Sequence, residues 1–501
     1  MATPTVTHHR HQRWSPNELS TELIVLILRQ LGDVDSRSLS VARLVSARFN
    51  AIVTPMKYHT LRVTQNIIMP QADIRFPEGI ANICAHTRHV RVDSDLNAEH
   101  VKRLLDKIER LSSLRYLLSF LICAFRRQHA KGNPETVGVT CKMICVKLYI
   151  ENLPLQDFRS ERHNPYLRAI PTEILVSLMM ATPAPPLTAR VESLKDLLLS
   201  SRRLETFWYD DRGQGTRFEF SDNERLPAFK ELSLRSYDWN HSSAAVGRHW
   251  DFSEIRCLSM VDVPLGLFLS SISFADFRRL ETLRLVDFNT HLPDRRLDIT
   301  RSQYFLIKQI QGLIDLDIIC QTESFPIDGI LKHGHSLRVL RFRDYTGFGD
   351  EHRRCPTIKL EALDVMAREL VNIRTLELDM DEGCCESHYF LLALCNFHQL
   401  NTLTLHTQTS LNPAMDMDTS VDHDRKRAME IFSLLIQGKQ AALWRSITIN
   451  VGGWKPIMAR RFSAPWRELH TRGVYAERCF IMEKQENGMF AVREEFPIRA
   501  S

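Results

Sequence analysis

A short hydrophobic frame, apolar-x-x-apolar-x-apolar, repeats along this chain and limits its fold more than any other feature. It recurs in steps of 25, 26 and 25 residues, starting at Leu204, Phe229, Ile255 and Leu280. Less regular copies follow, starting at Leu313, Leu337, Ile373, Leu400 and Trp444. Weaker copies start upstream at Thr87 and Met143, with a degenerate one near Leu114. Such a period indicates stacked units that bury their hydrophobic sides against one another.

Each copy of the frame predicts one short strand. In segments such as LETLRLVDF and LNTLTLHT, leucines alternate with polar residues, so the two kinds of side chain point to opposite faces of a sheet. Helical or irregular segments connect the strands, for example at residues 362–370, 389–394 and 428–436. These connections can cover one face of a parallel sheet, as that kind of sheet requires.

The frame is similar to the leucine-rich repeat. This resemblance implies an α/β fold: an irregular solenoid over residues 80–453, least regular up to about residue 190, with a parallel sheet on its concave face and helices or loops on its convex face. The Asn or Cys that usually follows the third leucine is missing, and the residues found instead are Tyr237, Phe288, Tyr345, Asp381 and Gln408. The solenoid is therefore expected to be degenerate.

The C-terminal segment shows a different pattern. Beyond Trp454 the frame fades, and residues 474–484 and 489–495 form two strand-like runs around Glu486-Asn487-Gly488. An Asn-Gly pair between two such runs indicates a β-hairpin. We expect residues 454–501 to cap the open end of the solenoid, because an uncovered terminal strand would leave an unpaired edge.

Near the N-terminus, six consecutive apolar residues run from Leu23 to Leu28. A helix that is apolar all round must be buried on every side. The only other apolar material between Leu19 and Leu61 is a second pattern from Leu39 to Val53, which is too small to cover both sides of such a helix. The sequence therefore predicts further cover, supplied by another protein.

The strings LSTELIVLILRQL and SLSVARLVSARFNAIVTPMKYHTL, with a polar turn between them, resemble the F-box, a three-helix module that docks on the Skp-type adaptor of cullin-RING ubiquitin ligases. Thr54–Tyr58 looks like the TPLxY ending of fungal members. Ser20 replaces the usual Pro, and the loop Gly32–Ser38 is slightly long. The resemblance implies an all-helical module over residues 14–61. It also implies an adaptor-facing surface formed or supported by Leu19, Leu23, Ile27, Leu31, Leu39, Val45 and Phe49.

Composition excludes several classes of function. The net charge is +5 with acidic and basic residues interspersed, which does not indicate nucleic-acid binding. The longest apolar runs, 117–125 and 174–181, fall short of the ~20 residues that cross a bilayer, so no membrane association is expected. Residues 1–13 lack the apolar core of a signal peptide and are expected to be a disordered tail. With eleven scattered cysteines, these features predict a cytoplasmic or nuclear protein.

The sequence contains none of the common enzyme motifs. There is no Gly-rich phosphate loop, no His-Glu-x-x-His pair and no Gly-x-Ser-x-Gly turn. Cys385, His388, Cys395 and His398 have zinc-like local spacing, but on a helix they would span nearly four turns. We therefore expect no catalytic residue, no cofactor and no metal site.

The polar strand positions form the candidate recognition surface, because side chains that flank the second and third leucines of each unit stand side by side on the inner face. Asp315 and Asp317, Arg341 and Arg343, and Glu377 and Asp379 alternate in sign, so one interpretation is a ladder of surface ion pairs. The other is that arginines and an aromatic anchor contact an acidic or phosphorylated protein client. The candidate client-binding residues are Trp208, Arg235, Arg284, Arg341, Arg343 and His406.

Together the two resemblances imply a substrate-recognition subunit of a Skp-cullin-F-box type E3 ubiquitin ligase. Its partners would be the Skp-type adaptor, through it a cullin-RING ligase, and a protein client whose identity the sequence does not reveal. Such a subunit is not itself an enzyme. The alternatives are a non-ligase complex of an F-box protein with the adaptor, or a repeat scaffold without a role in ubiquitination.

Overall fold

The structure is a computed structural model of the 501-residue chain. It describes residues 19–87, 89–92, 100, 103–104, 107, 147–153, 170, 172–180, 191–210, 215–287, 295–345, 355–408, 422–439, 443–452, 478–485 and 488–495. The predicted tail, the degenerate copy near Leu114 and the start of the Met143 copy lie outside these residues. The chain divides into two compact units, Met1–Leu153 with Ser160–Leu178, and Pro154–Arg159 with Met179–Ser501.

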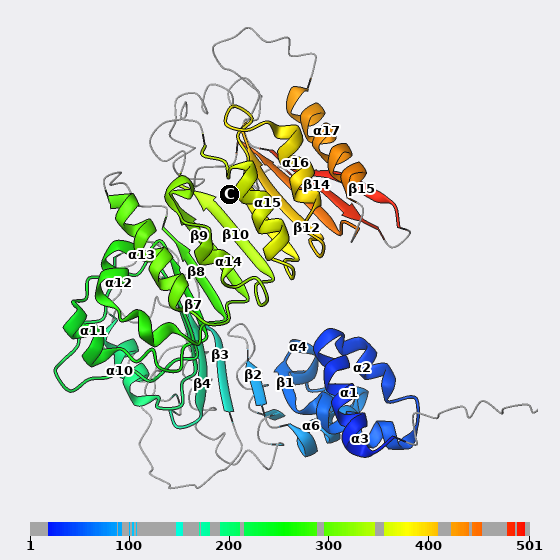
Figure 1. Ribbon diagram of the computed structural model, residues 1–501. Coiled ribbons are helices and arrows are strands. Elements are labelled where there is room, and N and C mark those ends of the chain that lie inside the picture. Colours follow the sequence, from blue (N-terminus) through cyan, green and yellow to red (C-terminus); the bar gives the residue numbers. More distant parts are fainter. Residues whose placement is uncertain are drawn as a thin grey trace, which may run out of the picture. The chain divides into compact units, whose positions relative to one another are not determined.

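The first unit begins with three helices, α1 (Thr21–Val34), α2 (Ser36–Ala42) and α3 (Ala47–Tyr58) (Figure 1). Ser20, which stands where the F-box family has Pro, caps α1: its Oγ accepts a hydrogen bond from the backbone N–H of Leu23 at 3.4 Å. That this helical module is an F-box stays a prediction.

A single residue, Asp35, separates α1 from α2. Its carboxylate accepts hydrogen bonds from the backbone N–H groups of Arg37 (2.9 Å) and Ser38 (3.2 Å), which makes it the N-cap of α2. The prediction of a polar turn across Gly32–Ser38 is therefore wrong. Both helices extend into this segment, because the capping side chain of Asp35 is sufficient to start α2. Ser46 caps α3 in the same way.

The helical module has a small core of its own. Ile24, Leu28, Leu39 and Val53 are buried together, and further side chains pack partly against them: Leu19, Leu31, Ala42, Phe49, Ile52 and Met56. Short elements follow: β1 (Thr60–Val63), α4 (Gln65–Ile68), α5 (Ala72–Arg75), α6 (Pro77–His86), β2 (His89–Val92), β3 (Lys147–Leu153) and β4 (Leu175–Met180). The last two residues of β4 already belong to the second unit.

Strands β1 to β4 lie in sequence order, and β1, β2 and β3 pair in parallel. Leu61, Val90 and Leu148 are in register. The hydrophobic frame therefore has a copy at β1 that the sequence did not reveal. Because Leu148 aligns with the second apolar position of β2 rather than the third, the copy expected from Met143 was placed two residues too early.

The second unit contains a sheet whose strands follow sequence order from β5 to β15. Neighbouring strands pair in parallel through β13: β5 (Thr206–Asp210), β6 (Glu231–Arg235), β7 (Cys257–Val261), β8 (Thr282–Val286), β9 (Asp315–Cys320), β10 (Val339–Asp344), β11 (Thr375–Asp379), β12 (Thr402–Thr407) and β13 (Ser446–Val451). Helix α10 (Glu192–Ser200) precedes β5. Further helices lie between the later strands: α11 (Ser243–His249), α12 (Leu265–Ser271), α13 (Arg296–Gln309), α14 (Asp328–Leu331), α15 (Leu360–Glu369), α16 (Ser387–Cys395) and α17 (His423–Gly438).

These helices cover one face of the sheet (Figure 1). The second apolar position of every copy lies in one unbroken register: Phe207, Leu232, Leu258, Leu283, Leu316, Leu340, Leu376, Leu403 and Ile447. The second and third apolar positions are at most 2% exposed in all nine copies. The core of the second unit thus lies between the sheet and its helices, and the α/β class and parallel sheet expected from the frame are confirmed.

The last two strands, β14 (Arg478–Lys484) and β15 (Phe490–Glu495), form an antiparallel hairpin, and β14 also pairs antiparallel with β13. Gly488 turns the chain with a φ of +82°, a conformation that favours glycine. The guanidinium of Arg478 joins the hairpin to the start of α17, because it contacts both Glu494 (2.6 Å) and the α17 N-cap residue Asp422. The predicted hairpin therefore extends the sheet at its C-terminal end.

At the sequence position where leucine-rich repeats usually carry Asn, Asp381 binds backbone instead. Its carboxylate accepts hydrogen bonds from the backbone N–H groups of Cys355 and Gly383 (both 2.8 Å) and from Nε2 of Gln408 (2.9 Å). At this position a buried carboxylate, hydrogen-bonded to three segments of the chain, takes the place of the usual Asn side-chain amide.

Candidate functional site

The helical module leaves several apolar side chains exposed. Leu23, Leu26 and Ile27 on α1 are 49%, 56% and 55% exposed, and Leu44 after α2 is 84% exposed. With two further residues they form the exposed apolar set: Leu23, Leu26, Ile27, Val41, Leu44 and Val45. Burial of α1 on every side is therefore wrong for the chain alone, because only Ile24 and Leu28 are fully buried. Six exposed apolar residues within one small module are typical of a protein-binding surface.

The adaptor-facing residues expected from the sequence fall into two groups. Leu23, Ile27 and Val45 are exposed and can contact a partner, whereas Leu39 belongs to the module's core. Others pack partly against that core and can only support the surface: Leu19, Leu31 and Phe49. Leu26, Val41 and Leu44 were not predicted to face the adaptor. Leu26 could have been, because helical spacing places it, like Ile27, on the same side of the helix as Leu23.

In the second unit, the sheet face opposite the helices carries rows of side chains across β5–β13, two of which hold the candidate residues. We call this face the helix-free face. The middle row reads Trp208, Ser233, Ser259, Arg284, Asp317, Arg341, Glu377, Thr404 and Thr448. The row toward the strand ends reads Asp210, Arg235, Val261, Val286, Ile319, Arg343, Asp379, His406 and Asn450.

The arginines at the centre of the helix-free face pair with carboxylates on neighbouring strands. Arg341 contacts Asp315 through Nη1 (3.1 Å) and Glu377 through Nε (3.7 Å). Arg343 donates through Nε (3.1 Å) and Nη2 (3.0 Å) to Asp379 Oδ1. These contacts have the geometry of the ion-pair ladder that alternating charges suggested.

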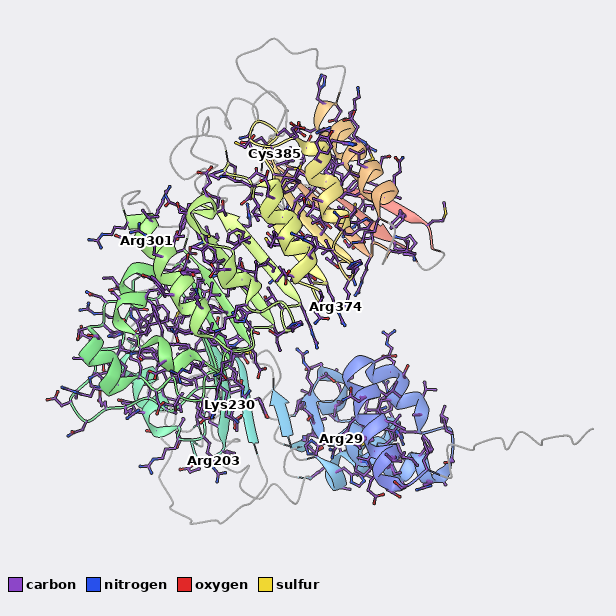
Figure 2. All side chains as sticks on the ribbon, in the orientation of Figure 1. Arg29, Arg203, Lys230, Arg301, Arg374 and Cys385 are labelled. Atoms are coloured by element: carbon purple, nitrogen blue, oxygen red, sulfur yellow. The ribbon has the colours of Figure 1, made fainter. Side chains whose placement is uncertain are left out.

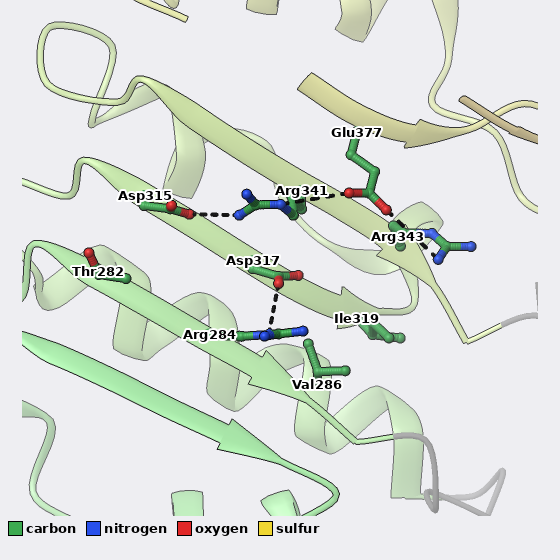
Figure 3. Close-up of a pocket in the computed structure, with 9 residues that line it drawn as sticks. All are labelled: Thr282, Arg284, Val286, Asp315, Asp317, Ile319, Arg341, Arg343 and Glu377. Atoms are coloured by element: carbon green, nitrogen blue, oxygen red, sulfur yellow. Dashed lines mark hydrogen bonds and ion pairs between the residues drawn. The ribbon is translucent and has the colours of Figure 1, made fainter. Parts of the chain in front are cut away.

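A pocket of about 450 Å³ spans β8 to β11 and is lined in part by Arg341, Arg343 and their partners Asp315 and Glu377 (Figure 3). Three arginines and three carboxylates balance one another in its wall: Arg284, Arg341, Arg343, Asp315, Asp317 and Glu377. The remaining wall is formed by Thr282, Val286 and Ile319. Of the expected client-binding residues, the pocket therefore brings together Arg284, Arg341 and Arg343.

The environment of the pocket shifts several pKa values. Burial raises the pKa of Asp317 to about 6, although the charge of Arg284 opposes the rise. Burial also raises the pKa of Asp315. For Glu377 burial acts in the same direction, but its hydrogen bond with His406 and the charges of Arg343 and Arg341 outweigh burial and lower the pKa. The carboxylates of one pocket therefore respond differently to pH.

His406 lies beside the pocket wall rather than in it. Burial and the charge of Arg343 lower its pKa, so the neutral ring donates from Nε2 to Oε1 of Glu377 at 2.7 Å. Its Nδ1 is buried without a hydrogen-bond partner among the described residues. His406 thus holds Glu377 in place and is too buried to serve as an outer contact.

Two other expected client-binding residues lie outside the pocket. Trp208 on β5 is 42% exposed, and its indole Nε1 donates to Oε1 of Glu231 at 2.7 Å. Arg235 on β6 approaches Asp210 at 3.9 Å. Five strand spacings of about 4.8 Å separate Trp208 from Arg341, so the two side chains do not form one compact site.

The sequence did not identify Thr282, Val286 and Ile319 as site residues. The interpretation of the inner face considered charged and aromatic side chains, whereas these residues occupy equivalent strand positions with small or aliphatic side chains. The strand register alone would have placed them next to Arg284 and Asp317.

The zinc-like cysteine pattern does not form a metal site. Cys385 precedes α16 (Figure 2), whereas Cys395 is buried at the end of that helix and its thiol contacts the backbone oxygens of Leu391 (3.4 Å) and Leu435 (3.7 Å). Among the residues that the structure describes, no group of three or more His, Cys, Asp or Glu side chains is placed to hold a metal ion. None of the helices that the structure describes is long and apolar enough to cross a membrane.

No model of a known protein family matches this chain, and a search of curated proteins finds no similar sequence. The fold and its surfaces therefore define only a class. The protein is an α/β protein with a long, mostly parallel, repeat-like sheet covered by helices on one face.

Proposed function

We propose that this protein is the substrate-recognition subunit of a Skp-cullin-F-box type E3 ubiquitin ligase. The observation that carries the proposal is the exposed apolar set on a helical module that already has its own buried core. A module with this arrangement stays folded while it offers hydrophobic side chains to another protein. The proposed partner is a Skp-type adaptor, because the same residues resemble an F-box.

The arrangement on α1 supports a docking role. Leu23, Leu26 and Ile27 follow the i, i+3, i+4 spacing of one helix side, next to the side that holds Ile24 and Leu28 in the core. Burial of each exposed Leu or Ile side chain in an interface contributes about 1.5–3 kcal/mol. Three such residues on one helix side can therefore form the centre of a stable interface.

The helix-free face of the second unit is the proposed client-binding surface. It offers a pocket and a row of charged side chains, and solenoid proteins use such faces for recognition. A receptor of this kind accelerates ubiquitin transfer by proximity, since it raises the effective concentration of a client lysine near the loaded conjugating enzyme. It needs no catalytic group of its own.

Affinity purification of the full-length protein from cells tests this proposal. Recovery of both a Skp-type adaptor and a cullin supports the ligase role. Recovery of the adaptor without a cullin favours the alternative, a non-ligase complex. A scaffold without a role in ubiquitination would recover neither, and the F-box assignment would then fail.

A matched set of variants shows which surface is responsible. The double variant Leu23→Asp and Ile27→Asp should lose the adaptor, because two charges would be buried in the interface. Leu443→Asp alters a side chain of the second unit that is 64% exposed and should retain the adaptor. Equal adaptor recovery from the double variant and the control would contradict the proposed interface.

A further inference from the structure

A row of residues along one edge of the sheet in the second unit lies outside the pocket. It is formed by the residue that precedes each strand from β5 to β13 and by the last residue of the antiparallel strand β14. From the second member on, each backbone N–H donates to the backbone oxygen of the preceding member at 2.7–3.1 Å, so neighbours in the row are about 4.8 Å apart. We call it the strand-start row: Glu205, Lys230, Arg256, Glu281, Ile314, Arg338, Arg374, Asn401, Arg445 and Lys484.

The two halves of the strand-start row differ in how their charges are balanced. In the first half Lys230 contacts Glu205 at 3.1 Å and Arg256 contacts Glu281, so each cation has a carboxylate from the row itself. Beyond Ile314 the row has no acidic member. Its cations there are all exposed, and none of them contacts a carboxylate among the residues that the structure describes. We call them the cationic half-row: Arg338, Arg374, Arg445 and Lys484.

Contacts within the chain do not account for these four cations. Two other lysines at this edge donate to backbone oxygens, Lys332 to that of Lys308 and Lys439 to that of Phe397. The cationic half-row makes no such bond within the described part of the chain, and the exposed Glu369 at the end of α15 contacts none of its members there. Like charges on neighbouring strands repel one another, so the half-row lowers the stability of the free protein and an external anion would offset that cost.

Neutral hydrogen bonds fix the loops that carry part of the cationic half-row. Nδ2 of Asn372 donates to the backbone oxygen of His335 at 2.7 Å, and Nε2 of Gln399 donates to Oδ1 of Asn372 at 3.3 Å. These bonds connect the loops before β10, β11 and β12, which include Arg338 and Arg374. Figure 2 shows Arg374 at this edge of the second unit. The two arginines therefore extend from a fixed backbone, and the amides that fix it supply no counter-charge.

The surroundings of the cationic half-row favour a protein segment over a nucleic acid. Two aliphatic side chains in the adjoining loops are exposed, Val371 before β11 and Leu443 before β13. The large aromatic rings of these loops, Phe397 and Trp444, are buried. Single-stranded nucleic acids usually stack their bases on exposed aromatic rings, and the described residues of these loops offer no exposed Phe, Tyr or Trp. Guanidinium groups bind carboxylates well, and Val371 and Leu443 can contact aliphatic side chains.

We propose that the cationic half-row binds an extended acidic segment of a partner protein. The half-row spans four strand spacings, roughly 19 Å. Alternate residues of an extended chain are about 6.6 Å apart, so about four acidic side chains on one side of a segment of roughly seven residues match this length. Aliphatic residues of the same segment contact Val371 and Leu443. This surface belongs to the second unit alone, so the inference goes beyond the ligase proposal and does not depend on it.

Labelled peptides and the purified full-length protein test the proposal by fluorescence anisotropy. The probe has the sequence Glu-Leu-Glu-Ser-Glu-Leu-Glu, and its control carries Gln in place of each Glu. At about 50 mM NaCl the Glu peptide should bind at least about tenfold more tightly than the Gln peptide, and this preference should shrink as salt is added. Equal binding of the two peptides would overturn the proposal.

Two double variants locate the binding surface. Arg338→Gln with Arg374→Gln should lower the affinity for the Glu peptide at least about tenfold, because it removes two unpaired cations. Lys230→Gln with Arg256→Gln removes the same charge from the same row but from cations that are already paired, and should lower it less than about twofold. Unfolding midpoints confirm that both variants fold. Equal losses in the two double variants would show that net charge alone attracts the peptide and would overturn the proposal.

Two further probes decide between acidic partners. An oligouridylate and vesicles of phosphatidylserine with phosphatidylcholine are titrated against the same proteins. Each should bind more weakly than the Glu peptide and lose little affinity in Arg338→Gln with Arg374→Gln. If either probe binds more tightly than the Glu peptide and that double variant removes its binding, the surface serves a nucleic acid or a membrane, and the assignment to an acidic protein segment is wrong.

Discussion

The helical module and the repeat sheet differ in how completely they bury their hydrophobic side chains. In the sheet, the second and third apolar positions of all nine copies from β5 to β13 are at most 2% exposed. In the module, four side chains form the buried core, and the exposed apolar set remains uncovered. The difference shows that the sheet completes its own core, whereas the module leaves hydrophobic side chains exposed, which the proposed partner would cover. The following predictions test this difference, from the largest expected effect to the smallest.

Truncation of a core leucine in each region gives the largest contrast. Leu376→Ala removes a fully buried side chain from β11 and should lower the free energy of unfolding by about 3–5 kcal/mol, because it leaves a cavity. Leu26→Ala in α1 should change it by less than about 0.5 kcal/mol, since Leu26 is 56% exposed. Denaturant unfolding followed by circular dichroism measures both. Similar losses would show that α1 is more buried than its exposure indicates.

The second unit also pairs the charged residues of its ladder internally. Arg343→Ala should cost about 3 kcal/mol of stability, because it leaves Asp379 and Glu377 without their shared cation in a buried setting. Arg235→Ala is the matched control and should cost less than about 0.5 kcal/mol, since Arg235 is half exposed and its contact with Asp210 is 3.9 Å long. Equal costs in the same unfolding assay would contradict a structural role for the ladder.

Asp317 should contribute to the pH dependence of stability. Its folded pKa of about 6 exceeds its usual value of 3.8, so the folded state holds this proton more tightly than the unfolded state. The stability of the wild type relative to Asp317→Asn should therefore fall by about 2 kcal/mol as the pH rises from 4 to 6, and remain level above that. Unfolding midpoints at several pH values give this difference. If the stability of the wild type relative to Asp317→Asn instead increased with pH, the raised pKa of Asp317 would be contradicted.

Replacement of Lys439 should give the smallest change in stability at pH 7. Its Nζ donates to the backbone oxygen of Phe397 at 2.6 Å and lies over the ring of Trp444, and burial lowers its pKa to about 8. The folded state thus releases this proton before the unfolded state, and stability should increase as the pH rises from 8 to about 10. Lys439→Met should remove that increase and gain about 1 kcal/mol at pH 7. A loss of stability at pH 7 would show that the hydrogen bond outweighs the cost of burial.

The strands of the second unit could be predicted from the sequence because only one register places all their leucines on the same face of the sheet. A shift by one residue would move every leucine of a copy to the polar face. The sequence did not predict strand β4, since Leu175–Met180 is apolar except for Ser177 and shows no alternation. The frame at β3 was misplaced because Val146 and Leu148 also fit the pattern, and only pairing with β2 selects Leu148 and Ile150.

The candidate surfaces were predicted less completely. The sequence located the charged strand positions, but which arginine is most buried and paired depends on side-chain contacts across strands, so it could not distinguish Arg343 from Arg284. It also predicted an α1 buried on every side, because six apolar residues in a row hide which side faces the core. The packing of α2 and α3 decides this, and it leaves Leu23, Leu26 and Ile27 exposed.

A binding titration with a purified Skp-type adaptor tests the central claim most directly, namely that the exposed apolar set is a partner-binding surface. Leu26→Asp should weaken adaptor binding at least about 100-fold, which corresponds to about 2.8 kcal/mol, while its unfolding midpoint stays close to that of the wild type. Leu443→Asp, which changes an even more exposed leucine of the second unit, should bind as the wild type does. Wild-type affinity in Leu26→Asp, or no adaptor binding by the wild type, would contradict the account.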